Sequence, residues 1–150
     1  MKIIIISFIL FVLTYTISAQ KLKESNVPEA VKTAFTGMYP DANHIKWSME
    51  DKKYEAEFKQ YGVESSVLFE TSGAYYQTET EIPKSSLPEA VREYVSKNLA
   101  GKKIKEAAKI TDAKGTITYE AEVGGSDYLF DANGVFISKS TDTDQEDEKE

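Results

Sequence analysis

The chain has 150 residues, no cysteine and a formal net charge of −7. The lack of cysteine excludes disulfides, thiolate metal sites and thiol catalysis. The length suits one compact core, or two small halves that share one. The acidic balance offers no basic stripe, so we expect neither nucleic acid nor an anionic membrane surface as a partner.

The N-terminal segment, residues 1–19, has the layout of a secretory signal peptide. Lys2 precedes an apolar run from Ile3 to Leu13, and small residues end the segment at Ala19. This order of charged start, apolar centre and small residues predicts cleavage after Ala19. The alternative is an uncleaved membrane anchor, because the segment is near the shortest length that spans a bilayer. No cysteine follows that could accept a lipid. We therefore expect a periplasmic or secreted protein with no membrane insertion after cleavage.

Two later segments read almost alike, "NVPEAV" from Asn26 and "SLPEAV" from Ser86. Each has a capping residue, a proline in the first turn, where no amide donor is needed, and a glutamate three positions after the cap. Both predict the start of an amphipathic helix. The first helix should end near Tyr39, before Pro40, and the second near Gly101. The apolar stripes at three-and-four spacing are Val31, Ala34, Phe35 and Met38, then Val91, Tyr94, Val95 and Leu99.

After each predicted helix the apolar spacing changes from helical to alternating, which predicts strands. The two halves repeat each other here too, with "YEAEF" at Tyr54 answered by "YEAEV" at Tyr119, and with hairpin turns at Gly73 and Gly134. The eight predicted strands lie around 45–49, 54–58, from 67 and from 74 in the first half, and around 104–111, 119–123, from 128 and from 135 in the second.

The connections are too short for parallel crossovers, so the predicted class is α+β. We expect a tandem repeat of one helix plus a four-stranded antiparallel meander, with the helices packed on one face of the sheet. The repeats should span residues 20–83 and 84–139, side by side or joined in one sheet. The tail, residues 140–150, holds six acids and one lysine. It is predicted to be disordered, and it lacks the glycine turn of a calcium loop.

The secretion signal, the doubled "PEAV" helix start, the "YEAE" strand and the "LF-acid-x-x-G" hairpin together resemble the PepSY-like family of secreted bacterial proteins. The fold of that family is related to that of the β-lactamase inhibitor proteins. The resemblance covers Val27 to Lys139. It implies tandem helix-plus-meander repeats, an extracytoplasmic location, and protein binding or inhibition in place of catalysis. The chain lacks the disulfides typical of the β-lactamase inhibitors, and no inhibitory loop residue can be matched position by position.

The residues themselves give little support for catalysis. His44 is the single histidine, and no G-x-S-x-G elbow exists, so a serine triad or a zinc site would lack partners. The best case for an enzyme is two pairs of acids, because residues two apart on a strand point the same way, about 6.5 to 7 Å apart. The pairs are Glu55 with Glu57 and Glu120 with Glu122. Their place on the polar side of alternating strands favours a solvated sheet face. We predict no catalysis, no cofactor and no metal.

The outer sheet face is predicted instead to dock an extracytoplasmic protein. Tyr75 is expected to share this face with Gln77 and Glu79, and Tyr61 lies at the "QYG" turn; tyrosines contribute large contact area with little entropy loss. Trp47 is expected in the core. The predicted function is a secreted or periplasmic, non-catalytic, protein-binding or inhibitor-like module that acts through the outer face and the hairpin loops. The alternatives are a small hydrolase that uses strand carboxylates and an envelope structural protein without a discrete ligand. The candidate partner-binding residues are Tyr61, Tyr75, Glu55, Glu57, Glu120 and Glu122.

Overall fold

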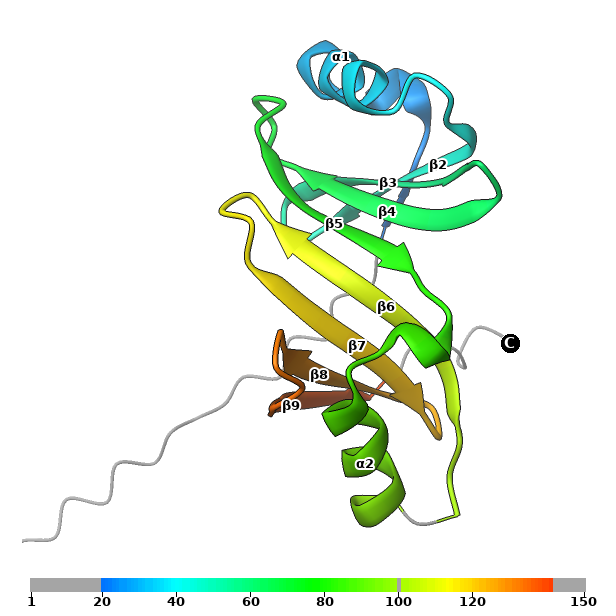
Figure 1. Ribbon diagram of the computed structural model, residues 1–150. Helices are drawn as coiled ribbons and strands as arrows, with labels where there is room; N and C mark the ends of the chain where they lie inside the picture. Colours follow the sequence, from blue (N-terminus) through cyan, green and yellow to red (C-terminus); the bar gives the residue numbers. More distant parts are fainter. Residues whose placement is uncertain (1–19, 100, 142–150) are drawn as a thin grey trace, which may run out of the picture.

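The computed structural model describes residues 20–99 and 101–141. The predicted signal peptide and most of the predicted tail lie outside these residues. The described residues form two α-helices and one antiparallel sheet of nine strands, in which each strand lies beside the next in sequence (Figure 1). This agrees with the predicted α+β class. In chain order the elements are β1 (Gln20–Leu22), η1 (Glu24–Asn26), α1 (Glu29–Met38), β2 (Asn43–Glu50), β3 (Lys53–Gln60), β4 (Val63–Phe69), β5 (Tyr75–Glu81), η2 (Lys84–Ser86), α2 (Glu89–Asn98), β6 (Ile104–Asp112), β7 (Ile117–Val123), β8 (Ser126–Asp131) and β9 (Phe136–Thr141).

Proline decides where each helix begins. Pro28 keeps an extended ψ of 143°, so α1 starts at the next residue, and the predicted side-chain cap at Asn26 is wrong. The carbonyl oxygen of Pro28 accepts the first hydrogen bond, 3.0 Å from the amide nitrogen of Val31. In the second repeat Pro88 has the same extended ψ of 143°, and α2 starts at the next residue, Glu89. Asn26 and Ser86 end short 3-10 helices instead, because a residue before proline is held away from helical geometry.

The first core lies between α1 and β2 to β4. Phe35 is its centre: its ring centroid lies 5.3 Å from that of Trp47 and 5.2 Å from that of Phe58, both edge-on. Ala56 and Val67 are fully buried beneath it. The prediction that Trp47 belongs to the core is confirmed. Edge-on aromatic pairs contribute roughly 0.5 to 1.5 kcal/mol each beyond the area that they bury.

The second core repeats this arrangement under α2 with fewer rings. Val91 and Ala121 are fully buried, as is Phe130. The ring of Tyr94 lies 5.3 Å from that of Phe130 and stacks on Phe136 at 5.1 Å. The apolar stripe of α2 therefore faces the sheet as its spacing predicts.

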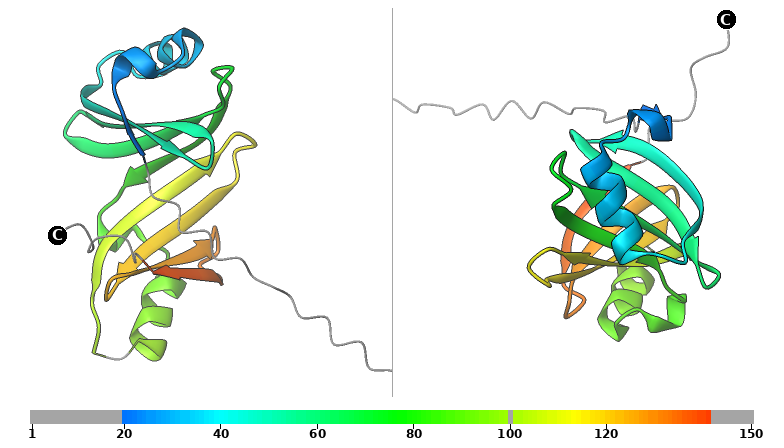
Figure 2. Two further views of the ribbon diagram at one scale, coloured as in Figure 1. Left: turned by 180° about the vertical axis from the view of Figure 1, so that it is seen from behind. Right: turned by 90° about the horizontal axis from the view of Figure 1, so that it is seen from above.

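Both helices cover the same face of the sheet. The register runs from Val67 to Thr78 and on to Thr111, and cross-strand partners share a face. Ala107, four residues before Thr111 on β6, belongs to the second core, so it lies on that face as well. In Figure 1 and in the left view of Figure 2 the two helices lie at opposite ends of the molecule, with the strands between them.

The glycine turn of each half packs against the first turn of its own helix. Gly73 has φ 83° and Gly134 has φ 82°, a region that disfavours side chains. A Cβ at Gly73 would lie 2.6 Å from the carbonyl oxygen of Ala30, and one at Gly134 would lie 2.8 Å from the Cβ of Ala90. The alanine of each "PEAV" and the glycine of each "LF" hairpin are thus contact partners, which explains why the two motifs recur together.

The two repeats join where β5 pairs with β6, so they share one continuous sheet. The register spans five residue pairs, from Gln77 with Asp112 to Glu81 with Ala108. A side chain adds to this seam, because the Tyr75 hydroxyl donates a hydrogen bond of 2.7 Å to the Thr111 carbonyl oxygen.

The structure changes the predicted boundaries at both ends of the sheet. β9 continues to Thr141, and Ser140 pairs with Asp127, so the predicted disordered tail begins too early. β1, which pairs with β2, was absent from the predicted strands because its three residues are too few for a periodic signal.

Candidate functional site on the outer face of the sheet

The outer face is the face of the sheet that the helices leave uncovered. Cross-strand pairs place Glu55 beside Leu68, Ser66 beside Glu79, and Glu79 beside Ile110 on it. Acidic side chains from seven strands, β2 to β8, lie on this face. They include Glu50, Glu55, Glu57, Glu64, Glu79, Glu81, Glu106, Glu120, Glu122 and Asp127.

The outer face contains two neighbouring hollows, of about 290 and about 300 Å³. Glu79, Glu120 and Asp127 line both of them. Among the described residues that line either hollow, none is a lysine or an arginine. The floor is partly apolar, with Ala108 in the first hollow and Ile110 in the second. The hollows therefore combine concentrated negative charge with a partly apolar floor.

Burial, and after it the negative charges of Glu55, Asp127 and Glu50, together raise the pKa of Glu79 to about 7. A buried carboxyl among like charges is favoured in its neutral form. Burial also raises the pKa of Glu50, with Glu55 as the next cause. The centre of the outer face thus holds a carboxyl group that changes charge near neutral pH.

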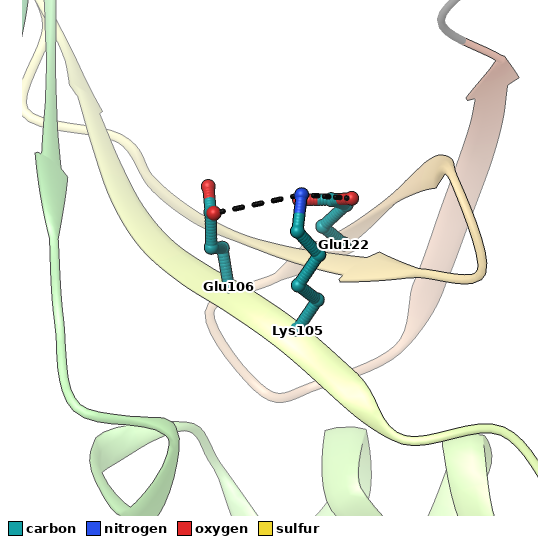
Figure 3. Close-up of polar contacts among 3 residues, drawn as sticks. All are labelled: Lys105, Glu106 and Glu122. Carbon is teal, nitrogen blue, oxygen red and sulfur yellow. Dashed lines mark hydrogen bonds and ion pairs between the residues drawn. The ribbon is translucent and has the colours of Figure 1, made fainter.

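A lysine neutralises acids at one edge of the first hollow. Lys105 extends its ammonium group between two glutamates of neighbouring strands, 3.1 Å from Glu122 Oε1 and 3.7 Å from Glu106 Oε1 (Figure 3). The hydrogen bond to Glu122 raises the pKa of Lys105. Lys105 itself is largely exposed, so solvent screens this ion pair and the pair contributes little to stability.

The four predicted glutamates all lie on the outer face but differ in their surroundings. Glu55 is half-buried and accepts a hydrogen bond of 2.7 Å from the Ser48 hydroxyl. Glu57 is exposed, 3.7 Å from the Lys46 ammonium group. Glu120 and Glu122 line the first hollow. The face assignment derived from the alternating "YEAE" pattern therefore agrees with the structure.

The two predicted tyrosines lie in different environments. Tyr61 is 82% exposed at the β3–β4 turn, and its hydroxyl donates a hydrogen bond of 2.6 Å to Asp41 Oδ2. Tyr75 was predicted on the outer face, and this is wrong: it packs against the first core, its ring 6.5 Å from that of Phe69. The cause is a bulge at Tyr76, since the register passes from Leu68–Gln77 to Phe69–Tyr75.

Tyr76 and Glu79 also belong to this surface, and neither is among the candidate binding residues predicted from the sequence. The bulge exposes 43% of Tyr76, and the Lys53 ammonium group lies 4.3 Å from its ring centroid. Neither residue has a local signal, because a bulge and a burial depth both depend on strands that pair from elsewhere in the chain.

Other kinds of site find little support in the part of the chain that the structure describes. His44 is exposed at the start of β2, as expected of a surface residue. Among residues 20–99 and 101–141, no group of three or more histidines and acids could hold a metal ion. No helix in those ranges is long and apolar enough to cross a membrane.

A family model described as "Putative beta-lactamase-inhibitor-like, PepSY-like" matches the chain twice, over residues 15–73 and 61–138. Two matches along one chain agree with the internal repeat. The comparison with curated proteins found no match.

Several solved structures resemble the chain. A "DUF2874 family protein" from Bacteroides ovatus is 24% identical, with a TM-score of 0.67, and the match covers 80% of this chain and 91% of that one. A "BLIP-like protein" from Bacteroides fragilis is 23% identical, with a TM-score of 0.59 and coverage of 81% and 92%. One of the "putative periplasmic proteins" from Bacteroides eggerthii is 21% identical, with a TM-score of 0.68 and coverage of 76% and 88%. At these identities the likeness shows the fold alone.

Proposed function

The chain belongs to the PepSY-like family, and on that premise we propose that it is a periplasmic, non-catalytic module that binds a protein on the outer face of its sheet. The description of the family supports an inhibitor-like role. The descriptions of two similar structures, one "BLIP-like" and one periplasmic, support the same role and location.

The observation that carries this proposal is the hollowed outer face itself. Antiparallel sheets often expose one face, but a plain solvated face needs neither hollows nor half-buried acids. Here, the side chains of Glu55, Glu79 and Glu120 are held in or beside hollows of a sheet that both helices stiffen from behind. Rigid concave surfaces bind partners with little loss of conformational freedom.

The charge of the outer face determines which partner surface fits it. A partner that places lysine or arginine side chains over the hollows would bring positive charge to linings that hold many carboxylates and, among the described residues, no lysine or arginine. Complementary charges mainly raise the association rate and fix the orientation of the complex. The partner's contacting surface is therefore basic in this proposal.

The hairpin loops supply contacts beside the hollows. Tyr61 at the β3–β4 turn is the most exposed of the large hydrophobic residues described, and its hydrogen bond to Asp41 limits the motion of its ring. A restrained, exposed tyrosine is suited to act as an anchor residue. Tyr76 takes over the role first assigned to Tyr75, since the bulge turns Tyr76 outward and Tyr75 inward.

A small hydrolase remains the second candidate, and one observation favours it. A carboxyl group with a pKa of about 7, as at Glu79, beside other carboxyl groups is what a general acid requires. Against this, Glu79 shares its hollows with many acids, and no single one is set apart as a nucleophile or base. An envelope structural protein would need none of these features.

The test is capture of a partner from the envelope fraction by the purified protein, followed by affinity measurement with the captured partner. Changing Glu55, Glu57, Glu120 and Glu122 together to glutamine should slow association and reduce its salt dependence. Tyr61→Ala should speed dissociation. The matched control changes four glutamates away from the outer face to glutamine, namely Glu24, Glu70, Glu89 and Glu93. Equal binding by the outer-face variant and the control would refute docking on this face, and turnover of a glycan or ester that is lost in Glu79→Gln would favour the hydrolase.

A further inference from the structure

Glu79 lies at the centre of the outer face. It is on β5, the middle strand of the nine, and it lines both hollows. Its cross-strand neighbours are Ser66 on β4 and Ile110 on β6. Within the described residues no side chain donates a hydrogen bond to the Glu79 carboxyl group or forms an ion pair with it. Its position offers an apolar neighbour on one side and a single hydroxyl on the other.

The charged groups that face Glu79 from the strands around it are nearly all acids. From the first repeat these are Glu50 on β2, Glu55 on β3, Glu64 on β4 and Glu81 on β5 itself. From the second repeat they are Glu106 on β6, Glu120 and Glu122 on β7, and Asp127 on β8. β9 contributes only the hydroxyls of Ser138 and Ser140.

The lysines near this cluster are engaged elsewhere. Lys105 lies between Glu106 and Glu122, as described above. Lys59 is 2.5 Å from Glu64, and Lys46 is 3.7 Å from Glu57, in the cross-strand row of Glu79 but on β2, three strands away from it. Lys53 lies over the ring of Tyr76, 4.3 Å from the ring centroid. Lys109 on β6 pairs with Thr80, so it lies on the helix-covered face. Among the residues that the structure describes, no cation is therefore paired with Glu79 to offset the acids around it.

We propose that Glu79 makes the outer face proton-linked: the centre of the face takes up a proton as acidity rises and gives it up as acidity falls, so that the attraction of the face for cationic groups changes with pH. The geometry carries this proposal, because a carboxylate with an apolar neighbour, few hydrogen-bond donors and many like charges is disfavoured. Its regulatory meaning rests on the docking function proposed above.

Because the pKa of Glu79 is about 7, a modest change of pH around neutrality alters the charge of its carboxyl group. Above that value the centre of the face carries an additional negative charge, and below it Glu79 is neutral. A cationic group that contacts Glu79 prefers the ionised form and releases the proton when it binds. Its affinity should then rise with pH, by at most about tenfold per pH unit below the pKa.

The direct test is a pH titration of the glutamate side-chain carboxyl carbons by NMR. The Glu79 resonance, assigned by its loss in Glu79→Gln, should have a midpoint near 7. Glu55→Gln removes a neighbouring negative charge and should move this midpoint downward. The matched control, Glu70→Gln, changes an exposed residue just beyond β4 and should leave it unmoved. A midpoint below about 5.5, which is close to the ordinary glutamate range, would overturn the proposal, as would equal effects of Glu55→Gln and Glu70→Gln.

A second measurement tests the change in attraction with N-acetylated deca-lysine as a cationic probe, because its lysine side chains keep their charge between pH 6 and pH 8 and the acetyl group removes the α-amino group that would titrate there. At low salt the parent protein and Glu70→Gln should bind the probe several-fold more tightly at pH 8 than at pH 6, and Glu79→Gln should lose most of that difference. No binding, or the same pH dependence in all three proteins, would refute the proton link. Neither measurement needs the natural partner, so failure to capture a partner would refute the docking function while leaving this result standing.

Discussion

Replacing Glu79 with glutamine should stabilise the protein at pH 8 and have little effect at pH 4.5. Folding raises the pKa of this carboxyl from 4.5 to about 7, mainly through burial. A raised acid pKa means that the folded state favours the protonated form. The stability that the group contributes is therefore complete below pH 4.5 and is lost as the pH rises through 7. Glutamine stays neutral at every pH, so the variant avoids this loss.

The size of the effect follows from the same values. The change from 4.5 to about 7, at 1.36 kcal/mol per pKa unit, corresponds to at most about 3 kcal/mol in the free energy of unfolding. Glu79 keeps some contact with water in the open hollows, so about 1 to 2 kcal/mol is the expected gain at pH 8.

Urea unfolding at pH 4.5 and pH 8, followed by circular dichroism, measures this difference. Glu70→Gln is the control, because that residue is exposed and should change stability by less than about 0.5 kcal/mol at either pH. If Glu79→Gln is no more stable than the parent at pH 8, or gains equally at both pH values, the burial argument for Glu79 is wrong.

Four further predictions concern the glycine turns, the seam and the chain ends. Gly134→Ala should cost about 2 to 4 kcal/mol of stability, because it adds a clash with Ala90 to an unfavourable φ. The control Gly115→Ala, with a similar φ and open space around it, should cost about 1 kcal/mol. Equal losses of stability in thermal unfolding would refute the contact between Gly134 and Ala90. Tyr75→Phe should lower stability by about 1 kcal/mol through the lost bond across the seam, and an unchanged urea midpoint would count against it. Intact-mass measurement of protein released from the envelope should give a chain that begins at or near Gln20; a retained Met1 in the membrane pellet would contradict this. Deletion of residues 142–150 should leave the melting temperature nearly unchanged, since they include no apolar residue, and a drop of several degrees would contradict that.

Features that depend on local spacing could be predicted from the sequence. The helix stripe led by Phe35 and the alternation in "YEAE" each place side chains by a fixed period. The structure agrees with both except at Met38, the last residue of the predicted stripe, which is 45% exposed. The repeated "PEAV" motif also predicted both α-helices, and the alternating apolar spacing predicted every strand but the shortest. These patterns can be recognised because the periodicity of a helix or a strand depends mainly on the local sequence of that segment.

Features that depend on how distant segments meet could not be predicted in the same way. The extra residue at Tyr76 reverses the alternation on β5, so Tyr75 turns from the expected outer face to the core. Glu79 belongs to "QTETE", which reads as an ordinary polar edge of a strand. Its burial and its raised pKa depend on the pairing of β6 with β5 and on the nearby acids of β2, β3 and β8, which are distant in sequence.

The seam between β5 and β6 bears on how a duplicated chain of this kind holds together. A lone repeat would end at β5 with unpaired backbone donors and acceptors, an edge that could pair only with a second molecule at sufficient concentration. Fusing two repeats through a short link makes that pairing intramolecular, at an effective concentration on the order of millimolar for short flexible linkers. The chain is in this sense a pseudo-dimer whose association no longer depends on dilution.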